Sequence, residues 1–179
     1  MVSRHRITSN GDRYFAPAWE LYLAAFPQME RRSLELHKEA LSFEKFHADA
    51  IVDGGEFIGL LFWWDFGSMR YIEHLATDPK LRGGGYGAKI MQQFMNEYSS
   101  PVILEVERPE DEIKQRRIGF YERLGFALNM HNYSQPSYNA KSDERLPLLL
   151  MSYPKPIQKE DVAAFCNERH PEIFFNREF

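Results

Sequence analysis

A glycine-rich stretch, "DPKLRGGGYGAK" (78–89), is the part of the sequence whose residue types point most directly to chemistry. Helices that begin after such a turn present main-chain N–H groups that bind a phosphate or pyrophosphate. Side chains in the turn would prevent close approach of the anion. The pattern therefore predicts an anion site made of the amides of residues 83–88, with the Arg82 side chain beside it and no metal.

Two other phosphate-binding folds use glycine-rich turns, and the surrounding sequence disfavours both. The dinucleotide pattern G-x-G-x-x-G/A is satisfied by Gly83, Gly85 and Ala88. Glu105 or Glu107 lies about 20 residues further on, as that fold requires. However, "DPKLR" separates the first glycine from the preceding strand, and the preceding elements resemble hairpins. A P-loop needs a glycine at position 88 and a hydroxyl two positions later, and the sequence has neither.

The segments around the turn predict a sheet flanked by helices. Three strands joined by short turns form an antiparallel meander, and a strand–helix–strand crossover follows, which requires a mixed sheet. Asp111 is suited to cap the later helix, with Ile113, Phe120 and Leu124 along one face. The predicted helices are 14–25, 30–41, one from residue 86 and one from residue 112; the predicted strands are 46–53, 56–66, 70–77, 102–107, 126–130 and 146–153.

Two motifs together resemble the GNAT N-acetyltransferase family. "LATDPKLRGGGYGAKIM" (75–91) is similar to the acetyl-CoA-binding segment of that family, whose signature is [RQ]-x-x-G-x-[GA]; Arg82, Gly85 and Gly87 occupy it. "RRIGFYERLGFAL" (116–128) is similar to the tyrosine-containing helix of the family, followed by Gly-Phe and a strand. The resemblance implies an α/β (α+β) GNAT fold: a mixed, mostly antiparallel sheet of about six to seven strands, splayed at the acetyl-CoA site.

The resemblance also implies the domain organisation and the function. Residues 1–154 are expected to form the acetyltransferase domain and residues 155–179 a helical extension of it. The expected activity is transfer of an acetyl group from acetyl-CoA to a primary amine of a small molecule or peptide, by direct attack in a ternary complex. A non-catalytic acyl-CoA-binding or regulatory module is the alternative. The cofactor contacts implied are Leu75, Ala76 and Thr77 for pantetheine, Gly83, Gly84, Gly85, Tyr86, Gly87 and Ala88 with Arg82 for pyrophosphate, and Tyr121 near the sulfur.

Two residues are candidate catalysts for this reaction. Tyr121 matches the family tyrosine; a phenol, whose pKa is about 10 against about 8.5 for a thiol, stays protonated at neutral pH and can donate to a leaving thiolate. A core aromatic is the alternative. Glu73 lies in an apolar strand, where desolvation would raise its pKa and make it a better base. A structural glutamate paired with an arginine is the alternative for Glu73. Strand alternation predicts that His74, a second possible base, faces the opposite side.

The acceptor site is expected at two segments, "AFPQMERR" (25–32) and "NYSQPSYNAKSDERLP" (132–147). In the family these positions correspond to the connection of the first two helices and the loop before the last strand. Aromatic and acidic side chains there would suit a small cationic amine, although ordinary packing explains them too. The candidate contacts are Phe26, Glu30, Glu105, Tyr133 and Tyr138.

The bulk composition narrows the cellular setting. A formal net charge of -4 disfavours nucleic-acid binding, and no run approaches the roughly 20 apolar residues of a membrane span. Cys166 is the only cysteine, so a reducing, cytoplasmic location and a buried inert thiol are expected. No covalent acetyl-enzyme is therefore expected. The aromatic tail, "EIFFNREF", either covers a sheet edge or meets a second copy, which leaves monomer and homodimer open.

Overall fold

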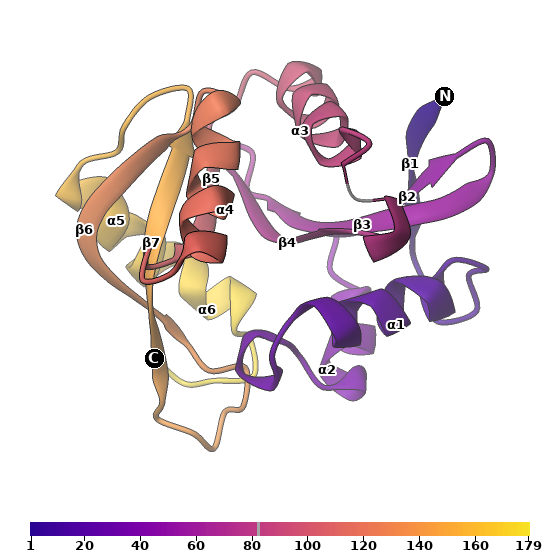
Figure 1. The fold of residues 1–179 in the computed structure, drawn as a ribbon. Coiled ribbons are helices and arrows are strands. Elements are labelled where there is room, and N and C mark those ends of the chain that lie inside the picture. The colour runs from indigo at the N-terminus through magenta and orange to yellow at the C-terminus, as the bar shows by residue number, and fades with distance from the viewer. Residues whose placement is uncertain (82) are drawn as a thin grey trace. The chain divides into compact units, whose positions relative to one another are not determined.

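The computed structural model describes residues 1–81 and 83–179, which form two compact units (Figure 1). The first unit comprises Met1–Ser100 and the second Pro101–Phe179. The described residues contain seven strands, of which four belong to the first unit and three to the second. Every pairing within a unit is antiparallel. The predicted α/β class and strand number are confirmed.

The first unit is an antiparallel sheet with the strand order β1-β2-β3-β4. Helices α1 and α2 cover one face of this sheet, and α3 covers the other (Figure 1). The bounds of the strands are β1 Val2–Ile7, β2 Phe46–Asp53, β3 Glu56–Asp65 and β4 Arg70–Thr77. The helices are α1 Phe15–Ala25, the 3₁₀ turns Gln28–Glu30 and Pro79–Leu81, α2 Leu34–Ala40 and α3 Tyr86–Glu97.

Two predicted strands of this unit have the observed bounds, and one strand was not predicted. Strands β2 and β4 coincide with the predicted 46–53 and 70–77. The Gly54-Gly55 turn between β2 and β3 has φ values of +59° and +89°, the left-handed conformation that tight hairpins require. Strand β1 was missed because only its end residues, Val2 and Ile7, are buried and charged residues lie between them.

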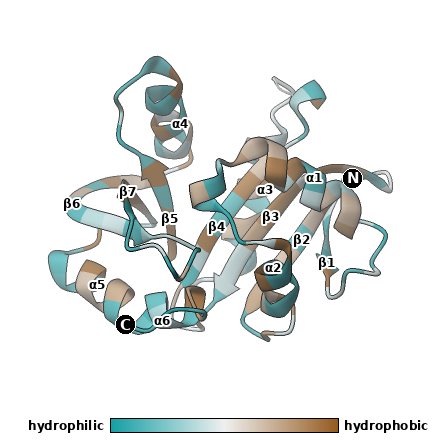
Figure 2. Cartoon of the chain, turned by 90° about the horizontal axis from the view of Figure 1, so that it is seen from below, coloured by the Kyte–Doolittle hydropathy of each residue, from teal (hydrophilic) through white to brown (hydrophobic). Residues whose placement is uncertain are grey.

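The core of the first unit is built on β3. Residues 58–64 of this strand are all buried, and its hydrophobic residues are brown in Figure 2. Helix α3 packs Ile90, Met91, Phe94 and Met95 inward, whereas Tyr98 follows the helix and is 43% exposed. Both faces of β3 are therefore covered, as its continuous apolar run indicates.

The second unit is an antiparallel sheet in the order β5-β7-β6. Helix α4 lies on one face, and α5 and α6 lie on the other (Figures 1 and 2). The bounds are β5 Val102–Glu107, α4 Glu112–Arg123, β6 Ala127–Pro136, β7 Arg145–Tyr153, α5 Lys159–Ala164 and α6 His170–Ile173, with a π-helical turn, Phe165–Arg169, between the last two. No helix within the described ranges is both long and apolar enough to cross a membrane.

Helix α4 begins as predicted but buries a different face. The Asp111 side chain accepts a hydrogen bond from the Lys114 amide and caps the helix. The inward residues are Ile118 and Tyr121, whereas Ile113 is 70% exposed. The prediction was therefore wrong for Ile113, whereas Phe120 and Leu124, the other predicted residues, are half-buried.

Candidate functional site

The glycine turn opens helix α3 at Tyr86, as the sequence predicted, and two of its glycines have positive φ. Gly85 is the N-cap of α3 with φ +72°, and Gly83 has φ +82°. A Cβ atom built at either residue would meet nothing within 4 Å, so open space lies beside the turn. Gly84 is different, since a Cβ there would lie 3.1 Å from the Tyr86 ring and 3.2 Å from the Leu81 carbonyl oxygen. The turn is therefore bare on its outer side and tightly packed at Gly84.

The first turn of α3 is arranged to solvate an anion. Its first helical hydrogen bond runs from the Lys89 amide to the Gly85 carbonyl oxygen, 3.1 Å away. The amides of residues 86–88 precede that bond, and Gly85 brings no capping side chain. Such amides, at the positive end of the helix dipole, favour a negatively charged group. Arg82, the predicted positive side chain, lies outside the described residues.

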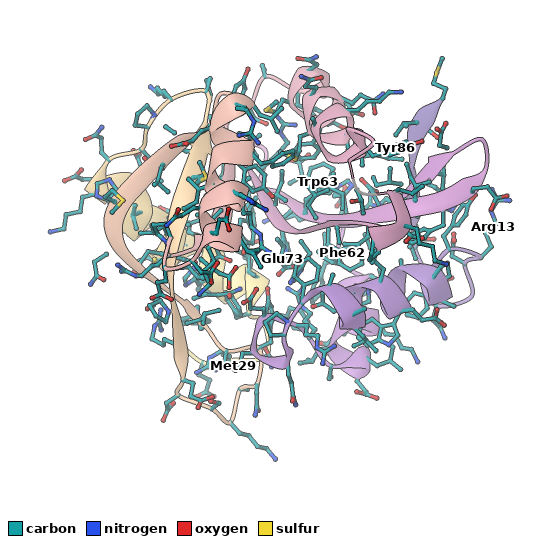
Figure 3. All side chains as sticks on the ribbon, viewed as in Figure 1. Arg13, Met29, Phe62, Trp63, Glu73 and Tyr86 are labelled. Carbon is teal, nitrogen blue, oxygen red and sulfur yellow. The ribbon has the colours of Figure 1, made fainter. Side chains whose placement is uncertain are left out.

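Tyr86 and the end of β4 complete the predicted cofactor segment in the first unit. The Tyr86 side chain, labelled in Figure 3, lies over Gly84, and its hydroxyl is 3.5 Å from Asp53 Oδ2. Leu75, Ala76 and Thr77 are half-buried on β4. Their position depends on Gly59 in β3, because a Cβ there would lie 2.5 Å from the Ala76 carbonyl oxygen.

Glu73, labelled in Figure 3, forms a buried ion pair with Arg32. Arg32 Nη1 and Nη2 donate to its two carboxylate oxygens at 2.6 and 2.7 Å. The Glu73 side chain is 0% exposed and that of Arg32 1%. Burial raises the pKa of the Glu73 carboxyl, but the Arg32 charge and contacts with His74 outweigh it and hold the pKa well below its ordinary value. The expected rise in pKa was therefore wrong, and the geometry is that of the structural alternative.

A β-bulge places His74 on the same side as Glu73. Phe62 pairs with His74 and Trp63 with Ile72, so Glu73 is an extra residue in β4. His74 Nδ1 lies 3.7 Å from Glu73 Oε2. The prediction that these side chains face opposite sides was wrong, because the bulge interrupts the alternation of the strand.

His74 also joins two of the predicted acceptor residues. Its Nε2 atom lies 2.7 Å from the Glu30 carbonyl oxygen, which can only accept, so Nε2 carries the hydrogen. The Phe26 ring meets the His74 ring edge-on, with centroids 4.5 Å apart. The connection between α1 and α2 is therefore attached to the bulge in β4.

Tyr121, the predicted acid, is a buried residue of α4. Its ring packs between Phe120 and Phe126, with centroids 5.0 and 5.7 Å away. Burial raises the pKa of Tyr121 to about 12, and the Arg117 charge opposes this effect. The hydroxyl is therefore protonated at neutral pH, as a proton donor must be.

Glu105 and Tyr133, two predicted acceptor residues, meet in the second unit. The Tyr133 hydroxyl hydrogen-bonds Glu105 Oε1 and lies 2.9 Å from His170 Nε2. Tyr138 lies elsewhere, against Phe174 of the C-terminal segment, with ring centroids 4.9 Å apart. His170 was not found from the sequence, and no local pattern marks it, since its partner lies 37 residues away.

The lone thiol does not have the surroundings of a nucleophile. Cys166 is half-buried in the π-helical turn. Burial raises its pKa, and the charge of Glu105 adds to that rise, although Arg145 opposes it. A catalytic thiol needs a lowered pKa.

Comparison with known proteins agrees with this geometry. A family model described as an acetyltransferase (GNAT) domain matches residues 46–128. YjbC of Bacillus subtilis, named as an acetyltransferase, is 25% identical over 161 residues, which cover 87% of this chain and 80% of YjbC.

Solved structures extend the likeness to almost the whole chain. A GNAT-family acetyltransferase from Bacteroides thetaiotaomicron is 35% identical, covers 96% of this chain and 98% of its own, and has a TM-score of 0.89. A GNAT-family acetyltransferase from Elizabethkingia anophelis with acetyl-CoA bound shares the fold at 13% identity, covering 84% of this chain and 96% of its own with a TM-score of 0.58. The chain therefore belongs to the GNAT family and is an N-acetyltransferase.

Proposed function

We propose that the protein transfers the acetyl group of acetyl-CoA to a primary amine of a small molecule or peptide, by direct attack in a ternary complex. Family membership supports acetyl-CoA as the donor, and a related fold binds acetyl-CoA. The raised pKa of Cys166 supports direct attack, because a protonated thiol is a poor acceptor for an acetyl group.

The observation that carries the proposal is the bare turn before α3. Gly83 and Gly85 adopt positive φ with open space beside them, and the amides of residues 86–88 stand at the positive end of the helix. A pyrophosphate fits this arrangement, because main-chain N–H groups reach it without a side chain in the way. The main-chain N–H and C=O groups of Leu75, Ala76 and Thr77 would hydrogen-bond the pantetheine arm, which would lie along β4 like an added strand.

The proton balance of the reaction defines what the protein must supply. Acetyl-CoA provides an activated acyl carbon and a thiolate leaving group. A nitrogen–carbon bond forms while the carbon–sulfur bond breaks. The acceptor ammonium loses two protons in total, one of which replaces the acyl group on sulfur while the other reaches water. The protein therefore needs a proton donor for sulfur and a carboxylate or water to receive the proton of the amine.

Tyr121 is the proposed donor. Its pKa of about 12 keeps the phenol protonated at neutral pH, so its hydroxyl can donate a hydrogen bond to the sulfur as negative charge develops there. Because a phenol of this pKa is a weaker acid than a thiol, any proton that it passes to sulfur must be replaced on the phenol by a proton that the amine loses.

Glu105, rather than Glu73, is the proposed carboxylate for the amine. Both Glu73 oxygens are engaged by Arg32, and the lowered pKa makes Glu73 a weak base. Glu105 is half-buried on β5, and its Oε1 accepts a hydrogen bond from the Tyr133 hydroxyl. Phe26 and Glu30 of the first unit, and Tyr133 and Tyr138 of the second, remain candidate contacts of the acceptor on the family resemblance.

The activity is tested by incubating the protein with acetyl-CoA and a panel of amines while free thiol is detected. Polyamines, aminoglycosides, amino acids and short peptides cover the chemical classes. We expect amine-dependent thiol release, with the acetylated product identified by mass. Thiol release at the rate of water alone with every amine would contradict the proposal.

The cofactor site is tested with two matched glycine variants. Gly85→Ala and Gly67→Ala place a methyl group at nearly the same φ, +72° and +71°, and both positions face open space. Each substitution should cost about 1–2 kcal/mol of backbone strain. Only Gly85→Ala should weaken coenzyme A binding, by about tenfold as measured by calorimetry. An equal loss of coenzyme A affinity in both variants would show that the turn before α3 is not part of the cofactor site.

A further inference from the structure

We propose that His170, in the C-terminal segment, is a positioning residue for the acetyl acceptor: through the Tyr133 hydroxyl it holds the Glu105 carboxylate in a set orientation. This inference rests on the proposed function, since Glu105 is taken there to receive the amine. It assigns a role to the segment that follows β7, which the family motifs do not reach.

The hydrogen bonds among the three residues can run in one direction only while Glu105 is ionised. A carboxylate accepts and never donates, so the single Tyr133 hydrogen points to Glu105 Oε1. The hydroxyl oxygen must then accept from His170 Nε2, 2.9 Å away. His170 therefore carries a hydrogen on Nε2. Burial and the Arg145 charge lower the pKa of His170 to about 4, which agrees with a neutral ring.

Burial increases along this chain of hydrogen bonds from Glu105 inward. Glu105 is half-buried, whereas Tyr133 is 3% exposed and His170 1%. The Phe165 and Phe174 rings hold the imidazole on two sides, with centroids 5.2 and 5.3 Å away. A buried polar pair that leads to a partly exposed carboxylate restricts its rotation before any ligand arrives, which is how supporting residues preorganise a site.

The same segment also fastens the loop between β6 and β7. Arg177 Nη1 donates to the carbonyl oxygens of Ser137, Asn139 and Ser142, at 3.0, 3.0 and 2.8 Å. Asn176 Nδ2 donates to the Tyr138 carbonyl oxygen at 2.9 Å. This loop belongs to the proposed acceptor surroundings, so one C-terminal segment orders both the loop and the carboxylate.

The inference is tested with His170→Phe and His170→Gln. Phenylalanine keeps the ring between Phe165 and Phe174 but cannot donate to Tyr133, whereas the Gln side-chain amide can donate from about the place of Nε2. We expect His170→Phe to raise KM for the amine about tenfold with KM for acetyl-CoA unchanged, and His170→Gln to recover most of the loss. Tyr133→Phe, which removes the hydroxyl itself, should behave like His170→Phe.

His131→Phe is the matched control. His131 Nε2 contacts the Ile157 carbonyl oxygen, 2.9 Å away, at the other end of the C-terminal segment. This variant should lower the melting temperature through weaker docking of the segment, without changing KM for the amine. An equal rise of that KM in His131→Phe and His170→Phe would overturn the positioning role, as would a failure of His170→Gln to recover activity.

A second measurement separates this inference from the proposed function. Nitrogen-15 spectra of the histidines in the unmodified protein distinguish hydrogen on Nε2 from hydrogen on Nδ1. We expect His170 to carry it on Nε2, and hydrogen on Nδ1 would overturn the inference even in an active enzyme. Absence of thiol release with every amine would instead contradict the proposed function, whatever the histidine spectra show.

Discussion

The Arg32 guanidinium and the Glu73 carboxylate face each other in a two-fold hydrogen-bonded ion pair from which water is excluded. The pair joins Arg32, two residues before α2, to the bulge in β4. Arg32 also lies over the Phe46 and Trp64 rings, 5.3 and 5.7 Å from their centroids. The charge pair is therefore part of the core that α2 and the sheet share.

Breaking this pair should destabilise the protein more than replacing it. Arg32→Met leaves a buried carboxylate without its partner and should cost about 3–5 kcal/mol in urea unfolding, whereas Arg32→Met combined with Glu73→Leu should recover most of that loss. Because Glu73 is proposed as structural, the double variant should also recover acetyl transfer. A double variant that is stable but inactive would indicate that Glu73 is the catalytic base.

Tyr121→Phe should slow the chemical step without weakening cofactor binding. Loss of the proton donor is expected to lower kcat about 100-fold, since general acids contribute factors of this order, while coenzyme A affinity in calorimetry stays unchanged. Tyr153→Phe is the control, because Tyr153 and Tyr121 both pack against Phe126, at 5.6 and 5.7 Å between centroids. Comparable kcat losses in the two variants would argue against an acid role for Tyr121.

Arg70 should be essential for the stability of the end of α3. Its guanidinium donates to the carbonyl oxygens of Phe94, Tyr98 and Ser100 at 2.5, 3.0 and 2.9 Å. Arg70→Met removes the donor from one buried and two part-buried hydrogen bonds and should lower the free energy of unfolding by about 3 kcal/mol or more. Arg70→Lys should recover little, because an ammonium lacks the planar fork.

A surface arginine gives the comparison for Arg70. Among the described residues, Arg116 pairs with Glu112, and their side chains are 73% and 76% exposed. Arg116→Met should change the free energy of unfolding by less than about 1 kcal/mol in the same urea titration. Similar losses for Arg70→Met and Arg116→Met would show that the α3 contacts of Arg70 are unimportant.

His37 should make the protein sensitive to acid. Burial first, and then the Arg32 and His74 charges, lower its pKa to about 3. The unfolded state has the ordinary pKa of about 6.5, so it binds more protons than the folded state between these values. The contribution of the neutral His37 ring to the free energy of unfolding is therefore fully present above about pH 6.5. It is lost as the pH falls toward 3.

His37→Phe should reduce this loss. His37 Nδ1 has no hydrogen-bond partner among the described residues, so phenylalanine leaves no new polar group unsatisfied. Between about pH 6 and 4 the slope of the unfolding free energy against pH should fall by about 1.4 kcal/mol per unit, which corresponds to one proton. The aromatic rings that contact His37 are those of Phe15, Trp19, Tyr22, Phe46 and Phe62. Parallel pH profiles for the two proteins would exclude His37 as the cause.

Local patterns in the sequence were sufficient for most elements and for the glycine turn. The strands at 46–53, 70–77 and 102–107 and the Asp111 cap follow from side-chain periodicity and from residues that act on their immediate neighbours. Positive φ at Gly83 and Gly85 is likewise a local preference of glycine. For this reason the family, the fold class and the proposed cofactor segment could be predicted without coordinates.

Contacts between residues distant in the chain could not be predicted in this way. The bulge at Glu73 depends on the register between β3 and β4, and it brings His74 to the side of Glu73 against the alternation of the strand. Arg32 is 41 residues from Glu73, and His170 is 37 residues from Tyr133. Which charges become partners, and therefore whether a carboxylate acts as a base or as part of the core, is set by tertiary packing, because pairing and desolvation depend on neighbours that no local pattern identifies.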